Sequence, residues 1–329
     1  MKGFRSGFLA LLLFTIFTSC GSNSSSSSDE DLFEVNSTLT YSNVLCDFEH
    51  GGTQKLNYSV FSPESGINRF VADDLEYSFM WICENSERIL IGNGVPNHSV
   101  TNGEFATPIL AQDVKWTFPL HPVNRNIATP VKEPGFAINS VKFDPGTAGT
   151  CPDEAVDELD CDPGAGRDTW RMVALPGEVS PWKFDFGTDT SNAHVQPGGT
   201  YHYHGVPEEL LPKLNTESES TMTLVGWAKD GYPIYARFGY SDALDSATSL
   251  KIVRSSYHTK DEADAGRPST GLIPMGHFEQ DWEYIEGSGD LDECNGRTGV
   301  TPEFPEGTYH YYVTDTYPFI QRCIKGALG

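Results

Sequence analysis

The chain has 329 residues and is strongly acidic, with 46 aspartate and glutamate residues against 22 lysine and arginine residues. Its formal net charge of −24 repels phosphate backbones and anionic lipid faces, which argues against nucleic-acid binding. Hydrophobic residues make up 38% of the chain and aromatic residues 12%, enough to bury a sizeable core. The composition therefore indicates a globular acidic protein.

The N-terminus has the layout of a secretory signal peptide. Two basic residues precede an apolar run at 8–17, which is too short to span a bilayer well. Small residues then lead to Cys20, as in a bacterial lipobox, where the cysteine is lipidated and becomes the new N-terminus. Ordinary signal cleavage near Ser19 or Ser22 is the alternative. We expect residues 1–19 to be removed and the chain to be lipid-anchored in the bacterial cell envelope, at the periplasmic or surface face of the outer membrane.

The rest of the chain divides into three expected parts. Residues 20–34 hold the lipidated cysteine and a serine-rich tether that cannot bury a core. An N-terminal β segment at 35–104 precedes the main domain at 105–329. Loss of residues 1–19 removes two basic residues and no acidic one, so the mature chain carries a net charge of −26. The membrane is therefore an expected partner through the lipid alone, and a metal ion or small molecule is the expected ligand.

Cysteine usage agrees with an oxidising compartment. Of seven cysteines, six remain once Cys20 is set aside, and an even number in a secreted chain indicates three disulfides. No Cys-x-x-Cys spacing occurs, so neither a zinc knuckle nor a thioredoxin-type site is indicated. Neighbourhood in the sequence favours the pairs Cys46 with Cys83, Cys151 with Cys161, and Cys294 with Cys323.

The hydrophobic pattern predicts a mainly β protein with antiparallel sheets in a sandwich-like arrangement, long loops and few short helices. Apolar residues seldom recur at helical spacing, and glycine or proline interrupts the chain every 8 to 12 residues. The clearest expected elements are strands at 223–228, 232–238 and 307–313, a hairpin turn at 229–231, a turn at 195–199, and short helices at 207–214 and 241–245.

The segment 199–205 carries the main functional signal. It predicts a strand in which His202 and His204 share one face, while Tyr201 and Tyr203 point to the other face and pack in the core. The two histidine Cα atoms would lie about 6 to 7 Å apart, so both rings can reach one metal ion.

Two further histidines are candidate ligands. His194 ranks first, because the turn at 195–200 would fold its strand back beside that of His202. His310 ranks next, through an internal repeat in which residues 197–204 recur at 305–312 with six of eight positions identical. That repeat indicates either two related strands, with His310 equivalent to His202 and Tyr312 to His204, or merely a common way to start an aromatic strand.

Three interpretations of the histidine strand stay open. The rings could hold a metal, act as acid–base groups without one, or be satisfied by neighbouring hydroxyl and carbonyl groups. Imidazole ligands in an oxidised compartment suit copper or zinc, whereas blue copper needs a free thiolate that disulfides would remove. The remaining histidines lack partners at ligand spacing: His50, His98, His121, His258 and His277.

The motif and its surroundings resemble the YHYH family, named for the tetrapeptide at 201–204. The likeness covers roughly residues 105 to 325, and the resemblance transfers no biochemical activity. Charged residues within these phrases could line a pocket, although turn formation or pairing near Cys294 would also explain them: Asp230, Asp281, Glu283, Asp292 and Arg297. The matching phrases lie at 136–145, 192–200, 227–235, 281–284, 291–297 and 300–309.

The segment 144–168 holds eight acidic residues and one basic residue, Arg167. Such an oxygen-rich loop could bind calcium at extracellular concentrations, but its spacing does not follow the EF-hand order. A solvated loop pinned by Cys151 and Cys161 is the alternative. The acidic residues are Asp144, Asp153, Glu154, Asp157, Glu158, Asp160, Asp162 and Asp168.

Common catalytic motifs are missing from the sequence, including the Gly-x-Ser-x-Gly elbow, His-Glu-x-x-His and nucleotide-binding loops. We therefore expect an envelope protein with a copper or zinc site formed by His202, His204, His194 and His310. An extracellular hydrolase that uses the histidines, with or without a metal, and a non-catalytic surface interaction module are the alternatives.

Overall fold

The computed structural model describes residues 44–62, 67–162, 164, 166–175, 186–215 and 220–328. They all belong to one compact unit, Asp31–Gly329. The expected signal peptide, Cys20 and the serine-rich tether lie outside the described residues. Within the described part of the chain, no helix combines the length and apolar character needed to cross a membrane.

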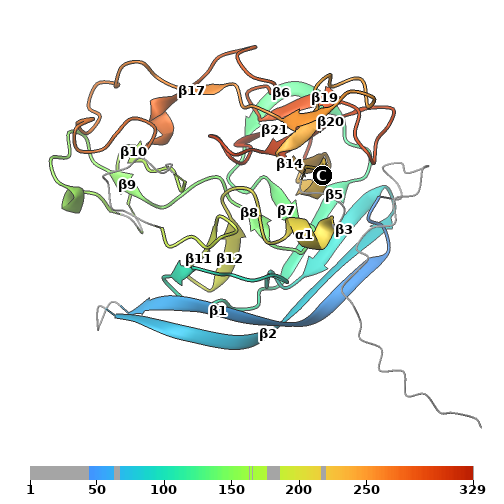
Figure 1. The fold of residues 1–329 in the computed structure, drawn as a ribbon, viewed down its shortest axis with the longest axis horizontal. Helices are drawn as coiled ribbons and strands as arrows, with labels where there is room; N and C mark the ends of the chain where they lie inside the picture. Colours follow the sequence, from blue (N-terminus) through green and yellow to red (C-terminus); the bar gives the residue numbers. More distant parts are fainter. Residues whose placement is uncertain are drawn as a thin grey trace, which may run out of the picture. The chain divides into compact units, whose positions relative to one another are not determined.

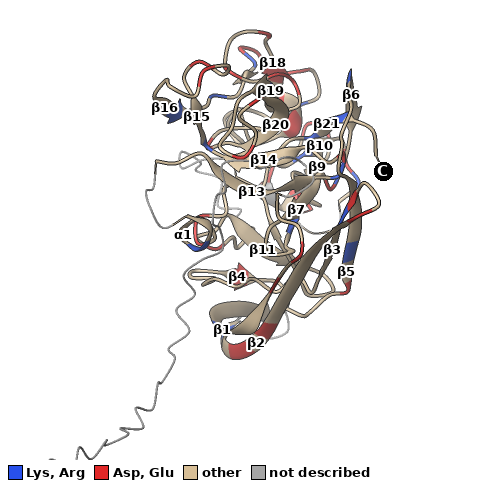
Figure 2. Cartoon of the chain, turned by 90° about the vertical axis from the view of Figure 1, so that its right-hand side faces the viewer, with Lys and Arg blue, Asp and Glu red and all other residues tan. Residues whose placement is uncertain are grey.

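A five-stranded sheet is built around the long antiparallel hairpin of β1 and β2 (Figure 1). In β1, Leu56, Tyr58 and Val60 are buried at every second position, so one face of the hairpin packs on the core. Acidic residues lie on β2 and on many other segments of the chain (Figure 2). In sheet order, the strands are β4 (Glu104–Phe105), β1 (Phe48–Ser62), β2 (Ile67–Glu84), β3 (Glu87–Gly92) and β5 (Val114–Pro119).

The second large sheet has eight strands and carries the histidine motif. Its neighbouring strands are antiparallel except for β12 with β8 and β14 with β20, which are parallel. In sheet order, they are β11 (Ala193–Gln196), β12 (Thr200–Tyr203), β8 (Lys142–Phe143), β7 (Gly135–Ala137), β13 (Thr223–Ala228), β14 (Pro233–Ala236), β20 (Thr308–Val313) and β19 (Gly296–Gly299).

The two large sheets share one hydrophobic core. The indole Nε1 of Trp81 on β2 donates to the carbonyl oxygen of Ile138 at 2.9 Å. Arg88 on β3 lies 3.5 Å above the ring of Trp227 on β13, a cation–π contact inside the core. Because β5 completes the sheet that β1–β4 begin, the expected segments 35–104 and 105–329 pack into a single sandwich-like body.

Smaller β ladders and three disulfides hold the loops. The disulfides join Cys46 to Cys83, Cys151 to Cys161 and Cys294 to Cys323, the three pairs expected from sequence neighbourhood. The two-stranded ladders pair β6 (Asn124–Pro130) with β21 (Cys323–Gly326), β9 (Thr150–Cys151) with β10 (Trp170–Arg171), β15 (Phe238–Tyr240) with β16 (Leu250–Ile252), and β17 (Tyr257–Thr259) with β18 (Trp282–Tyr284).

Helix is scarce in the described chain, as the pattern predicts. The expected helix at 207–214 forms only as α1 (Leu211–Leu214), and two short 3₁₀ turns occur at Glu158–Asp160 and Glu279–Asp281. The helix expected at 241–245 is wrong. Asp242 and Asp245 instead accept hydrogen bonds from backbone N–H groups two residues further on, which favours turns over a helix.

Candidate metal centre

The hairpin of β11 and β12 brings three histidines together. Gly198 and Gly199 turn the chain with φ values of +97° and +81°, a conformation that suits glycine. The antiparallel register then places His194 directly opposite His202. His204 follows two positions later, on the same side as His202.

The three imidazole rings form a nearly equilateral group. Their centroids lie 4.7 Å apart for His194 and His202, 4.6 Å for His194 and His204, and 4.7 Å for His202 and His204. One nitrogen of each ring lies within 4.8 Å of the others, and the Nε2 atoms of His194 and His204 are 3.0 Å apart. Ligand atoms on a tetrahedral zinc ion are separated by about 3.3 Å, so small ring rotations would complete such a site.

Backbone carbonyl groups fix which nitrogen faces the centre. His194 Nδ1 donates to the carbonyl oxygen of Phe186 at 2.7 Å, and His202 Nδ1 donates to that of Thr200 at 3.1 Å. Both rings therefore present the Nε2 lone pair to the group. This is the usual arrangement of metal-bound histidines, whose other nitrogen is held by a carbonyl or carboxylate.

Burial keeps the rings in the form that binds metals. His202 and His204 are each only 2% exposed. Burial lowers the pKa of both rings well below the usual value, and the neighbouring imidazoles lower it further. Neutral imidazole is the form that ligates zinc and copper.

The two tyrosines of the motif point away from the histidines into the core, as expected. Tyr201 donates to Asp189 Oδ2 at 2.5 Å, and Tyr203 donates to His98 Nε2 at 2.5 Å. Asn139 Nδ2 also donates to the Tyr203 hydroxyl, at 3.0 Å. Burial lowers the pKa of His98 to about 4, so this ring accepts the bond as a neutral imidazole. Sequence spacing gives no sign of this role for His98.

His194 and His202 form part of the wall of a cleft of about 1390 Å³. Next to them, Lys142 Nζ lies 3.0 Å from Glu133, 3.0 Å from Asp144 and 3.1 Å from Gln196. The spacing of histidines cannot reveal this wall, because the strand β8 that supplies Lys142 comes from a different part of the sequence.

A second lysine completes this ionic network. Lys229 Nζ lies 3.2 Å from the same Glu133 carboxylate and 3.9 Å from the centre of the Trp116 ring. Burial would raise the pKa of Glu133, but the two lysines outweigh it, and the pKa is lowered. Glu133 is therefore an ionised bridge between two lysines of the cleft wall.

The fourth expected ligand, His310, lies elsewhere in the sheet. It sits on β20, which four strands separate from β12. Its Nδ1 donates to the carbonyl oxygen of Thr308, and its Nε2 accepts from the hydroxyl of Tyr312 at 3.0 Å. The group of three histidines therefore does not include it.

None of the five charged pocket candidates is among the residues that line this cleft, and four of them have structural contacts in the described chain. Asp230 lies at the expected turn between β13 and β14, where it accepts from the Tyr311 hydroxyl at 2.6 Å. Asp281 forms a buried ion pair with Arg267 at 2.6 Å. Asp292 accepts from Tyr309, Arg297 donates to Tyr312, and Glu283 is exposed on β18.

The described acidic residues of 144–168 do not gather as the histidines do. Asp160 accepts from the backbone N–H groups of residues 156 and 157, and Asp157 from that of residue 159. Asp153 accepts from the Trp170 indole at 2.9 Å. These carboxylates hold local turns, which agrees with a solvated loop closed by the Cys151–Cys161 disulfide.

Fold and site together define a disulfide-bonded β protein with three histidines grouped at the wall of a cleft. The chain belongs to the YHYH family, since residues 115–326 match the family described as "YHYH protein". The match begins in β5 and ends with β21, so it contains the whole eight-stranded sheet. Neither a curated protein nor a solved structure matched the chain.

Proposed function

We propose that this chain is an envelope protein of the YHYH family that holds one zinc or copper ion through His194, His202 and His204. The observation that carries the proposal is the triangle of rings 4.6 to 4.7 Å apart, with carbonyl groups holding Nδ1 of two of them. Three neutral imidazoles leave a fourth position free for water or a small ligand.

The donor set narrows the choice of metal. Nitrogen-only ligation suits zinc and copper, whereas calcium and magnesium prefer oxygen ligands. The six described cysteines are all in disulfides, so no thiolate from this part of the chain is available for a blue-copper site. Near His194 and His204, the 3.0 Å contact between two nitrogens requires a proton between them when no ion is bound. Since His194 holds its own proton on Nδ1, the proton between the two rings belongs to His204 Nε2 and would move to His204 Nδ1 when that ring binds a metal.

Elemental analysis of the purified chain tests the proposal. We expect about one zinc or copper ion per chain in the wild type and a loss of at least tenfold in His202→Ala/His204→Ala. His310→Ala is the matched control, because it removes an equally buried histidine from the equivalent strand of the same sheet. Unchanged metal content in the double variant, or equal loss in the control, would sink the proposal.

The cleft favours a second candidate, a metal-dependent hydrolase. A zinc-bound water at the open position would face a cleft whose wall contains Glu133 and Asp144. A hydrolase needs a carboxylate near such a water as an acid–base group, although both of these are paired with Lys142. Turnover of chromogenic ester, phosphoester and peptide substrates by the zinc-loaded chain would support this candidate. The same turnover by His202→Ala would contradict it.

We also propose that Cys20 anchors the chain in the envelope through a lipid. The support is the short apolar run followed by small residues and a single cysteine. In a bacterial host, we expect the wild type in the membrane fraction and Cys20→Ser in the soluble periplasmic fraction. Identical fractionation of the two chains would contradict the anchor.

A further inference from the structure

The eight-stranded sheet consists of two halves with the same chain order and the same sheet order. In the first half, β11, β12, β8 and β7 run from the sheet edge to the centre, and in the second half β19, β20, β14 and β13 do so. In each half, the edge strand pairs antiparallel with the next, and that strand pairs parallel with the third. Figure 1 shows β11, β12 and β8 on one side of β7, and β14, β20 and β19 on the other.

The register of the two edge hairpins is identical. Residues 197–204 and 305–312, the repeat seen in the sequence, occupy equivalent positions in them. Asn192 and Asn295, which precede the edge strands, share a φ of +56°. In the first hairpin, the paired residues are Ala193 and Tyr203, His194 and His202, Val195 and Tyr201, and Gln196 and Thr200. In the second hairpin, the equivalent pairs, in the same order, are Gly296 and Tyr311, Arg297 and His310, Thr298 and Tyr309, and Gly299 and Thr308.

The halves meet through equivalent residues. In the antiparallel ladder of β7 with β13, Phe136 faces Trp227, Gly135 faces Ala228, and Ala137 faces Gly226. Exchanging the two halves reproduces this ladder, so a local twofold axis passes between Phe136 and Trp227. Both glycines are needed, because a Cβ atom would come within 2.2 Å or 2.4 Å of the opposite backbone carbonyl oxygen.

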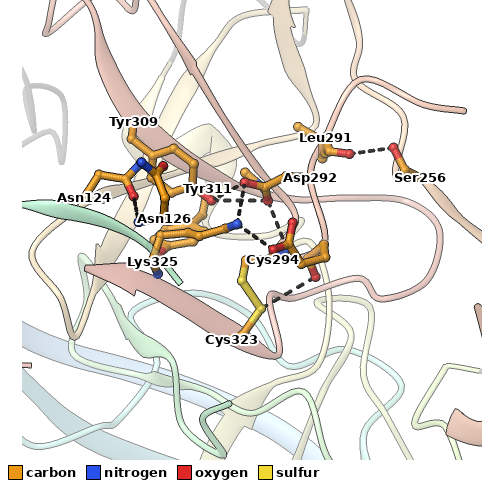
Figure 3. A network of polar contacts seen from close by, with 12 residues as sticks. Asn124, Asn126, Ser256, Leu291, Asp292, Cys294, Tyr309, Tyr311, Cys323 and Lys325 are labelled. Atoms are coloured by element: carbon orange, nitrogen blue, oxygen red, sulfur yellow. Dashed lines mark hydrogen bonds and ion pairs between the residues drawn. A yellow bond between two sulfur atoms is a disulfide. The ribbon is translucent and has the colours of Figure 1, made fainter. Parts of the chain in front are cut away.

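Polar contacts repeat as well. Tyr201 donates to Asp189 at 2.5 Å in the first half. In the second half, Tyr309 donates to Asp292 at 2.9 Å (Figure 3). The other oxygen of each carboxylate accepts from the backbone N–H groups two and four residues further on. An arrangement this detailed, repeated in two places, indicates two copies of one unit and not a chance likeness of aromatic strands.

The halves differ at two of the three positions of the histidine group. Arg297 takes the place of His194, Tyr312 that of His204, and His310 that of His202. Arg297 Nη2 donates to the Tyr312 hydroxyl at 3.1 Å, and that hydroxyl donates to His310 Nε2 at 3.0 Å. His310 keeps the same Nδ1 contact as its counterpart, at the same distance of 3.1 Å.

We propose that Arg297, Tyr312 and His310 are the second copy of the metal centre, in which an internal guanidinium takes the place of the metal ion. In both copies, the Nε2 lone pair of the histidine faces a positive charge. In the first copy it would donate directly to a metal ion, and in the second it accepts the hydroxyl proton of Tyr312, whose oxygen accepts from Arg297. Burial lowers the pKa of His310 to about 3, so its Nε2 is an acceptor at all physiological pH values. The second half is thus a structural copy whose site needs two substitutions to hold a divalent transition metal.

Conversion of the second copy tests this inference with zinc as the probe. In the full chain, Arg297→His/Tyr312→His should raise the bound zinc from one to two ions per chain. In the His202→Ala/His204→Ala background, the same pair should raise it from zero to one. The metal readout in the wild-type background rests on the proposed function of the first copy. A folded converted chain, judged by circular dichroism, that gains no zinc in either background overturns the inference.

The reciprocal exchange needs no metal and therefore separates the two proposals. His194→Arg/His204→Tyr should rebuild the guanidinium, hydroxyl and imidazole chain on His202 and bind no zinc. Its thermal midpoint should equal that of the metal-free wild type and exceed that of His194→Ala/His204→Ala. A midpoint no higher than that of the alanine variant overturns the equivalence of the copies. If the wild type binds no metal but the exchange variant is as stable as expected, only the proposed function of the first copy is overturned.

Discussion

Asp189 holds the hairpin that bears the histidines, and its titration should be visible in the stability of the whole chain. The carboxylate is 6% exposed, and burial raises its pKa to about 7 from an ordinary value of 3.8, against the hydrogen bonds from Tyr201 and two backbone N–H groups. Because the folded-state pKa lies above the unfolded-state pKa, the folded chain holds the proton more tightly. This contribution to stability is complete below about pH 4 and is lost as the pH rises to about 7.

The size of the effect follows from the shift. Each pKa unit corresponds to about 1.4 kcal/mol, so the gap of about three units represents roughly 4 kcal/mol in full. About 2.5 kcal/mol of this stabilisation is lost when the pH rises from 5 to 8. Asp189→Asn removes the titration and keeps the shape of the side chain. When the pH is raised from 5 to 8, the free energy of unfolding of the variant should rise by about 2.5 kcal/mol relative to that of the wild type.

Urea unfolding at pH 5 and pH 8 measures this difference, and any constant effect of the amide cancels in it. Asp261→Asn is the control, because it makes the same change in charge at an exposed position. If Asp189→Asn differs from wild type by the same free energy at both pH values, Asp189 is ionised in the folded state and our reasoning about its burial is wrong.

Three other outcomes are expected. Gly226→Ala should cost about 1–3 kcal/mol in urea unfolding, since its Cβ would meet a carbonyl oxygen of β7 at 2.4 Å, while Gly271→Ala should be neutral. Tyr203→Phe should cost about 1–3 kcal/mol, because it leaves His98 without its buried donor, yet metal content should not change. Treatment with EDTA should lower the thermal midpoint of the wild type and leave that of His202→Ala unchanged, since a bound ion at 1,000 times its Kd contributes about 4 kcal/mol. Equal shifts in both chains would contradict the metal site.

Much of the fold could be predicted from local pattern. Alternation of side chains placed His202 on β12 and His204 just after it on one face, and a glycine-rich turn placed His194 beside them. Disulfide partners lay close in the sequence, which made neighbourhood a sufficient guide. The turn between β13 and β14 followed from Asp230 and Gly231.

The remainder depends on pairing over long distances. Lys142 reaches the histidine group because β8 pairs with β12 across about 60 residues, and no local pattern encodes that ladder. His310 was expected near His202 because the repeat was visible but its place in the sheet was not. The repeat relates the two strands by symmetry, which puts them near opposite edges and keeps their side chains apart.

The ladder of β7 with β13 has a consequence for the origin of the chain. A segment that pairs with its own counterpart around a twofold axis forms an isologous contact, the kind by which identical subunits make a closed dimer. One half alone would carry an open sheet edge at Gly135–Ala137, which a second copy would cover. The present sheet therefore has the form of a dimer fused into one chain, in which equivalent positions of the two halves became free to carry different residues.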